Sequence, residues 1–426
     1  MKQLLVFQGP VSSRSGYGDH SRDLVKSLIK MDRFNIKIND MPWGVCPRDG
    51  LKKGVHDEII SMLVNGSQLD RQPEVFVQVS VPNEFYTLGK FNIGITAGIE
   101  TTLCAPEWIE GLNRMDLIIV PSNHAKNVFL NTVYDKKDKA TKQTISQLKV
   151  QKPIEVLFEG VDLEVFNTKN EIPKSINKAM ENVSTKYNFL VCAHWLNGEY
   201  GHDRKDLATT LRCFLETFKK TNKKPGLVLK TSSATFSVKD RENMLARIDA
   251  VKESSGLSDS QFSNIYLLHG DLSEREMNGL YNHHKIKSMV SFTKGEGYGR
   301  PLAEFSTTGK PIIASNWSGH LDFCKYIVKV GGDLKNVHES ASWEKVILPE
   351  AKWFYVNVAH ASGCLLEVFN KNKTAIENAK KQKSHINKNF SLEAMDIAFA
   401  ELINTNIPVQ EQIKLPKLEL PKLNKV

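Results

Sequence analysis

The sequence lacks the features that mark secreted and membrane-spanning proteins. None of its apolar runs is long enough to cross a bilayer. The opening MKQLLVFQGP has one lysine and few apolar residues before Gly9 and Pro10, so it does not have the apolar region of a signal peptide. We therefore expect a protein of the cytoplasm, or of the host cytoplasm if its source is viral.

Cysteine is scarce as well, with six in 426 residues. The six stand far apart, at positions 46, 104, 192, 213, 324 and 364. This scatter argues against both a disulfide framework and a zinc cluster. The sequence predicts a reducing environment and no metal site.

Charged residues of both signs are present, but basic residues are in excess: the sequence has 57 Lys and Arg and 48 Asp and Glu, a net charge of +9. Such an excess suits nucleotides, nucleic acid or an acidic membrane surface as partners. The lysines are dispersed, however, and no aromatic residues are interleaved with them as in proteins that bind single strands. This distribution favours a solubilising role over a polyanion-binding surface.

Short β-branched runs alternate with amphipathic helical stretches along the whole chain, which predicts an α/β fold of parallel sheets covered by helices. In the first half the predicted strands are Leu4–Phe7, Val75–Val79, Asn92–Thr96 and Leu117–Val120. In the second half they are Phe189–Ala193, Leu227–Lys230, Ile265–Leu268, Ser288–Phe292 and Pro311–Ala314. Helical spacing of apolar residues predicts a first helix over Asp19–Met31.

Two doubly wound domains of this kind bind ligands at the carboxyl ends of their strands, in the cleft between them. The apolar-poor segment Asn167–Lys186 is the expected linker. We expect residues 1–170 to form an N-terminal Rossmann-like domain and residues 171–390 a C-terminal one. Residues 391–406, with a helix over Leu392–Ile403, should pack back on the first domain, and residues 407–426 should form an extended tail.

The densest functional signal is KGEGYGRPLAEFSTTGKPIIASNWSG, residues 294–319. Glu296 follows a predicted strand, Gly297 and Gly299 allow close backbone approach, and a helix then carries Glu304 two turns beyond Glu296. Free amides at such a helix start suit a phosphate or sugar oxygen, and the two carboxylates can accept hydrogen bonds from vicinal hydroxyls. Taken alone, this pattern equally fits a glycine turn followed by solvated first-turn carboxylates.

EGYGRPLAE followed by GKPIIAS resembles the E-x7-E signature of retaining GT-B glycosyltransferases, the large family that includes sucrose synthases and mannosyltransferases. Four further segments resemble that family in the family's order. SGYGDHSRDL (15–24) is similar to its N-terminal glycine loop and VPSNHAKNVF (120–129) to its last N-domain strand-loop-helix. VLFEGVDLEVF (156–166) is similar to its interdomain crossing, and DRKDL (203–207) to its phosphate-binding turn.

The resemblance implies a GT-B fold, two Rossmann-like domains facing a central cleft, with residues 1–170 as the acceptor domain and residues 171–390 as the nucleotide-sugar domain. It also implies site residues. Glu296 would lie at the donor sugar, with Arg204 and Lys205 neutralising the diphosphate as negative charge develops on it. Glu304 would bind the ribose hydroxyls. Backbone contacts to the donor would come from Gly16, Gly18, Gly297, Tyr298 and Gly299.

The sequence departs from the family in two places. CAHWLNGEYGH (192–202) has no arginine after the first C-domain strand, so His194 or Arg204 would replace that contact. GITAGIETT (94–102) lacks the family's histidine near the donor sugar, which makes Glu100 a candidate on the acceptor side. Lesser candidates are Ser122 on the acceptor side, which could equally cap a helix, and Lys230, His269 and Gly270 at strand ends on the donor side.

The implied activity is metal-independent transfer of a sugar, with retention, from a UDP-, GDP- or ADP-sugar to an acceptor hydroxyl, without a cofactor. The acceptor stays open between polysaccharide, small molecule, lipid-linked sugar and modified bases of DNA, the last suggested by the basic balance and the lysine-bearing tail. A non-transferase nucleotide-sugar enzyme or a binding module is the remaining alternative. A dinucleotide oxidoreductase fits less well, because GPVSSRSGYG lacks the G-x-G-x-x-G spacing.

Overall fold

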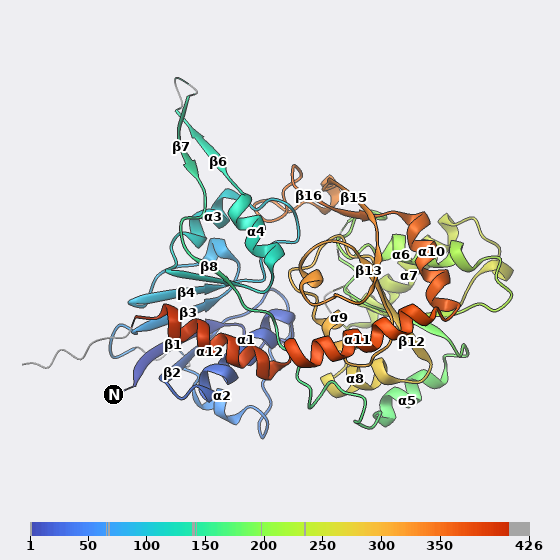
Figure 1. Cartoon of the computed structure of the whole chain (residues 1–426), viewed down its shortest axis with the longest axis horizontal. Coiled ribbons are helices and arrows are strands. Elements are labelled where there is room, and N and C mark those ends of the chain that lie inside the picture. Colours follow the sequence, from blue (N-terminus) through green and yellow to red (C-terminus); the bar gives the residue numbers. More distant parts are fainter. Residues whose placement is uncertain are drawn as a thin grey trace, which may run out of the picture.

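The structure, a computed structural model, describes residues 2–408 except 65, 67, 68, 139, 140, 142, 197, 234 and 235. It forms two lobes side by side, each with a parallel sheet between helices (Figure 1). The first sheet has the order β2 (Phe34–Asp40), β1 (Gln3–Gly9), β3 (Val75–Val79), β4 (Phe91–Ile95), β5 (Leu117–Val120), β8 (Ile154–Val156). The second has the order β11 (Ile265–Leu268), β10 (Gly226–Lys230), β9 (Asn188–Cys192), β12 (Ile286–Ser291), β13 (Ile312–Ser315), β14 (Val328–Val330).

Both sheets are covered on two faces. Adjacent residues of a strand point to opposite faces of the sheet, so they pack into different apolar cores. Phe189 and Val191 of β9 belong to one apolar cluster, and Leu190 between them belongs to another. The helices are α1 (Gly16–Lys30), α2 (Asp57–Ser61), α3 (Pro106–Leu112), α4 (Asn123–Asn131), α5 (Lys174–Glu181), α6 (Leu207–Phe218), α7 (Val238–Ser254), α8 (Glu274–Asn282), α9 (Arg300–Ser306), α10 (Val358–Phe369), α11 (Lys373–Asn389) and α12 (Leu392–Asn406).

The nine predicted strands all form, with ends that differ by two residues at most. The sequence interpretation missed β2, β8 and β14, two of which have only three residues. It also missed two antiparallel hairpins, β6 (Tyr134–Lys137) with β7 (Thr144–Leu148) and β15 (Gly332–Asn336) with β16 (Lys352–Val356). The first of these projects from the body of the first lobe (Figure 1).

Two helical predictions need correction. The first helix begins at Gly16, three residues before Asp19, because the Ser15 side chain caps it by accepting a hydrogen bond from the Gly18 amide. The expected linker contains α5, whose Ile176 and Met180 are buried against the second domain. Two apolar residues were enough for one short helix to dock there.

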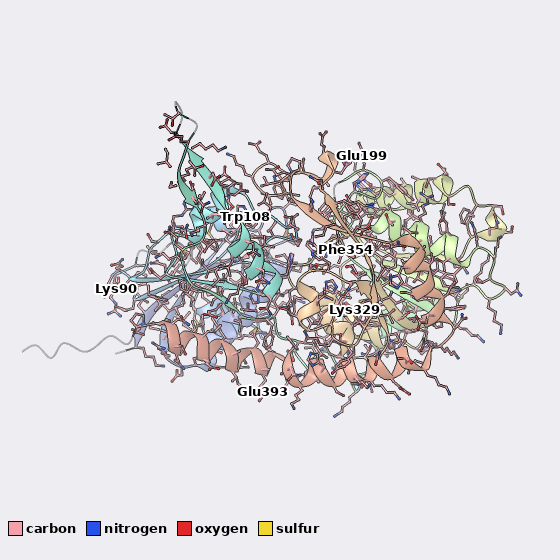
Figure 2. All side chains as sticks on the ribbon, turned by 45° about the horizontal axis from the view of Figure 1, so that its top comes forward. Lys90, Trp108, Glu199, Lys329, Phe354 and Glu393 are labelled. Atoms are coloured by element: carbon pink, nitrogen blue, oxygen red, sulfur yellow. The ribbon has the colours of Figure 1, made fainter. Side chains whose placement is uncertain are left out.

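The last helix of the described residues lies on the lobe that contains the first strand. Helix α11 runs along the second lobe, and α12 continues onto the first, with Glu393 near the passage between them (Figure 2). Met395, Phe399 and Ile403 of α12 are fully buried in the same core as β1 and α1. Ile407, which was expected in a loose tail, is buried there too; residues 409–426 of that predicted tail lie outside the described residues.

Candidate active site

A cavity of about 430 Å³ lies between the two domains. Its N-terminal side is formed by the start of α1 and the segment after β4. Its C-terminal side is formed by the ends of β9 and β10, the turn before α6 and the glycine loop before α9. The predicted site residues that line it are Gly16, Glu100, Arg204, Lys205, Lys230, Glu296, Gly297, Tyr298, Gly299 and Glu304, together with His194.

Glu296 is the centre of an ion-pair cluster that joins three segments. Its carboxylate is 2.5 Å from Lys205 Nζ and 3.4 Å from Arg204 Nη1. Arg204 Nη1 is also 3.0 Å from Glu100 Oε1 of the other domain. Burial alone would raise the pKa of Glu296, but Lys205 and Arg204 outweigh it and lower the pKa to about 2. Glu296 is therefore ionised throughout the physiological range.

A buried lysine, Lys294, holds the turn that carries Arg204 and Lys205 in place. Lys294 is fully buried; its ammonium lies 2.9 Å from Asp206 Oδ1 and donates a hydrogen bond of 3.0 Å to the Asp203 carbonyl. Its backbone amide donates to the Arg204 carbonyl at 2.8 Å. Asp206 is left-handed, with φ of 52°, so the turn ends sharply where α6 begins. These contacts fix the two cations on the cavity surface.

The glycines of the loop 295–299 allow the domains to approach each other. A β-carbon on Gly295 would lie 2.1 Å from the Glu100 carbonyl oxygen, and one on Gly297 would lie 2.4 Å from that of Ala97. Both carbonyls belong to the segment after β4. Gly299 has φ of 104°, a conformation that favours glycine, and α9 begins directly after it. The loop is thus built for close contact on its N-domain side as well as on its cavity side.

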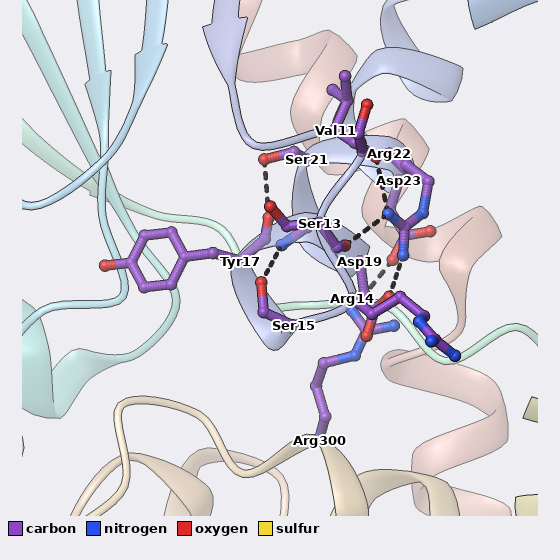
Figure 3. A network of polar contacts seen from close by, with 12 residues as sticks. Val11, Ser13, Arg14, Ser15, Tyr17, Asp19, Ser21, Arg22, Asp23 and Arg300 are labelled. Carbon is purple, nitrogen blue, oxygen red and sulfur yellow. Dashed lines mark hydrogen bonds and ion pairs between the residues drawn. The ribbon is translucent and has the colours of Figure 1, made fainter. Parts of the chain in front are cut away.

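Glu304 and Arg300 lie on one face of α9. Glu304 accepts a hydrogen bond of 3.0 Å from the Tyr281 hydroxyl and is 3.9 Å from Arg300 Nε. Burial raises the pKa of the Glu304 carboxyl to about 8, although Arg300 opposes the rise. Arg300 reaches across the domain boundary, as Figure 3 shows, where its Nη1 lies 3.0 Å from Asp23 of α1 and 3.4 Å from Glu159 of the crossing segment.

The loop between β1 and α1 is fixed by a second buried arginine. Arg22 Nη1 donates to the carbonyls of Val11 and Ser13 at 2.8 and 3.0 Å. Arg22 Nη2 pairs with the Asp19 carboxylate (Figure 3). Gly18 is packed against its own loop, and its donor contact stays a prediction. It does not line the cavity, and a β-carbon there would lie 2.0 Å from the Ser13 carbonyl oxygen, so Gly18 serves the packing of this loop.

Three of the weaker candidates also lie outside the residues that line this cavity. Ser122 is fully buried and caps α4 by accepting a hydrogen bond from the Ala125 amide, which was its alternative reading. His269 follows β11 and forms a 2.8 Å contact with Asp240. Gly270 follows it with φ of 136°. A donor role for these last two stays a prediction.

Several residues of the site were not singled out from the sequence. Tyr17 and Trp43 line the cavity and stack, with ring centroids 3.9 Å apart. The helix motif included Arg300 without a role, and Lys294 was read only as the residue before the glycine loop. A charged residue shortly after a buried strand was the one available signal for Lys294, since its acidic partners lie about ninety residues away in the chain.

Two features are absent from the described residues. Within that part of the chain, no helix is both long and apolar enough to span a membrane. No group of three His, Cys, Asp or Glu side chains in the same residues is placed to hold a metal ion.

Comparison with known proteins relates the chain by structure and not by sequence. No family model and no curated protein matches it. A glycosyltransferase from Rickettsia africae ESF-5 is similar, with a TM-score of 0.62 and 12% identity over 95% of this chain and 99% of that chain. Sucrose-phosphate synthase from Thermosynechococcus elongatus is also similar, with a TM-score of 0.60 and 11% identity over 95% of this chain and 99% of that chain.

A third similar structure is HepE from Anabaena, in complex with UDP and glucose. Its TM-score is 0.55 at 11% identity, over 95% of this chain and all of that chain. With the order 3-2-1-4-5-6 in the second sheet and a cleft between two parallel-sheet domains, these likenesses show the GT-B fold that the motif resemblance implied.

Proposed function

We propose that this chain is a retaining, metal-independent glycosyltransferase that uses a nucleotide-sugar donor. The observation that carries the proposal is the cluster of Glu296, Lys205 and Arg204, which shares one interdomain cavity with Glu304. The cavity also follows the rule that open α/β sheets bind ligands outside the carboxyl ends of their strands. The fold is compatible with this activity, since glycosyltransferases share it.

In the proposed reaction, the bond between the anomeric carbon and the β-phosphate oxygen breaks as the acceptor oxygen bonds to the same face of that carbon. The bonding electron pair leaves with the nucleoside diphosphate, and the acceptor proton passes to a phosphate oxygen of the leaving group. Lys205 and Arg204 stabilise the negative charge that develops on the diphosphate. Glu296, ionised because of these cations, would bind donor-sugar hydroxyls and stabilise positive charge at the anomeric carbon.

A hydrolysis assay against UDP-, GDP- and ADP-sugars tests the assignment. We expect slow release of nucleoside diphosphate from one donor class, and a loss of about 100-fold or more in Lys205→Ala. Lys220→Ala, an exposed lysine at the end of α6, is the matched control and should leave the rate unchanged. Binding of a donor without hydrolysis or transfer would instead identify a binding module.

Two further measurements test the finer parts of the proposal. Turnover should survive EDTA, since no step above requires a metal; loss in EDTA with recovery on adding a divalent cation would contradict this. The product's anomeric configuration, determined by proton NMR, should match that of the donor. Inversion would exclude attack on the face from which the phosphate departs.

A further inference from the structure

We infer that the acceptor is an uncharged carbohydrate whose ring binds against Tyr17 and Trp43, and that a phosphorylated acceptor is disfavoured. This inference rests on the proposed function. It follows from the charges and the aromatic surface that the N-terminal domain presents to the cavity.

The cations of the cavity all come from the C-terminal domain, which also contributes the carboxyl groups of Glu296 and Glu304, whereas the described residues of the N-terminal side contribute carboxyl groups and no cation. Among the described residues that line the cavity, every lysine and arginine belongs to the C-terminal domain: Arg204, Lys205, Lys230 and Arg300. The N-terminal domain contributes the carboxylates of Asp19 and Glu100, and the crossing segment contributes that of Glu159. His20 adds no charge, because burial lowers its pKa to about 3.

The cations have partners or a donor role already. Lys205 and Arg204 are placed for the donor diphosphate. Arg300 is held by Asp23 and Glu159 at 3.0 and 3.4 Å, and Lys230 lies at the end of β10 with its ammonium 5.4 Å from the Phe236 ring centroid. A second anionic group bound on the N-domain side would therefore face carboxylates without a cation of its own.

Two other arginines of that domain, one in the loop before α1 and one in α1, are also engaged. Arg14 pairs with Asp49 at 2.7 Å and with Asp271, and Arg22 pairs with Asp19 while holding two carbonyls of its own loop. Neither side chain lines the cavity among the described residues. Recruiting either for an acceptor phosphate would break these contacts.

The same side of the cavity carries a preformed aromatic surface. Tyr17 and Trp43 stack with an interplanar angle of 22°, and Tyr17 is fixed because its hydroxyl accepts a hydrogen bond of 3.0 Å from the Ala97 amide. Thr96 Oγ1 lies 3.2 Å from the same oxygen. A pyranose presents C–H groups on one face, which suit the negative face of an aromatic ring. Its hydroxyls suit carboxylate acceptors such as Asp19 and Glu100.

Ligand binding to the full chain tests this inference. The probes are methyl glucoside, methyl galactoside and methyl mannoside, each paired with its 6-phosphate, titrated in the presence of UDP, GDP or ADP and followed by ligand-observed NMR. We expect at least one neutral glycoside to bind more tightly than its phosphate. Trp43→Ala should weaken that binding about tenfold, and Trp43→Phe should restore most of it.

Trp343→Ala is the matched control, because Trp343 is 66% exposed and does not line the cavity. It should leave glycoside binding unchanged, and thermal unfolding of both tryptophan variants checks that each is folded. Tighter binding of the phosphates, no binding of any glycoside, or equal affinity in Trp43→Ala would overturn the inference. Failure of the proposed function would be recognised by a different result, namely that no nucleotide sugar is hydrolysed or transferred.

Discussion

Lys294 is a residue whose importance comes entirely from its surroundings. It is fully buried beneath the turn of Arg204 and Lys205, with Asp206 as its ion-pair partner and with the Asp203 carboxyl nearby. Burial raises the pKa of Asp203 to about 6, although Lys294 opposes the rise. Without the lysine, two buried carboxyl groups would lose the cation that compensates them.

We expect Lys294→Met to reduce the free energy of unfolding by about 3–5 kcal/mol, the usual cost of removing one partner of a buried pair. Denaturant titration measures it. The double variant Lys294→Met with Asp206→Asn should recover part of the loss, because it no longer buries the Asp206 charge. Lys329→Met, at an exposed lysine, is the control; an equal loss there would contradict this explanation.

The raised pKa of Glu304 predicts that the stability of the protein depends on pH. Its pKa in the folded protein, about 8, is above the ordinary value of 4.5, because the carboxyl is buried. The folded state thus holds this proton more tightly than the unfolded state does. The stability contributed by the protonated form is complete below about pH 4.5 and is lost as the pH rises through about 8.

The comparison is with Glu304→Gln, which keeps the shape of the neutral acid and does not titrate. The free energy of unfolding of the parent, minus that of the variant, should fall between about pH 5 and about pH 9. A difference that stays constant, or grows with pH, would show that burial does not hold the proton on Glu304.

At the scale of elements, α12 is an integral part of the first domain's core although it is the last helix of the described residues. We expect Phe399→Ala to destabilise the protein by about 3–5 kcal/mol, because the Phe399 side chain is fully buried against that core. Ile397→Ala, on the same helix but 65% exposed, should cost less than about 0.5 kcal/mol. Equal effects in chemical denaturation would mean that α12 is not docked as described.

Elements with a strong local pattern could be predicted from the sequence. The strands β3 and β5 were found because their apolar signals lie within a few residues. β2 alternates buried and exposed residues, yet its charged and amide side chains concealed it. The antiparallel strands β15 and β16 pair across sixteen or more residues, so no turn signal joins them.

Across the whole molecule, Arg300 is the main charged contact between the lobes at the cavity. Backbone contacts assist it: the amide of Thr102 donates to the Lys352 carbonyl at 2.8 Å, and the amide of Asn123 donates to Asp322 Oδ2 at 2.7 Å. Removing the guanidinium would leave the carboxyl groups of Asp19, Asp23 and Glu159 without this cation at the boundary.

We therefore expect Arg300→Met to open the lobes, seen as a larger radius of gyration in small-angle X-ray scattering. Added salt should reverse part of the change by screening the carboxylates. Arg275→Met, at an exposed arginine of α8, is the control. An unchanged radius in the Arg300 variant would show that the remaining interdomain contacts, including the ion pair of Arg204 with Glu100, are enough to keep the lobes together.

Interdomain contacts are also where sequence-based prediction ends. The motifs placed Glu296, Glu304, Arg204 and Lys205 in one cleft, and the structure brings them there because all four follow strands of the same sheet. Arg300 with Asp23, separated by 277 residues, has no local signature. Such pairs depend on how two finished domains meet, which periodicity and spacing within either domain do not encode.

The return of α12 to the first lobe has a consequence for the order in which the protein is made. Residues 3–156 supply the strands of that lobe early in translation, yet Met395, Phe399 and Ile403 emerge from the ribosome only after the entire second lobe. The core of the first lobe must therefore stay incomplete, with an apolar groove uncovered beside α1, until the second lobe and α12 have been synthesised. A nascent chain stalled before residue 391 would expose that groove to chaperones.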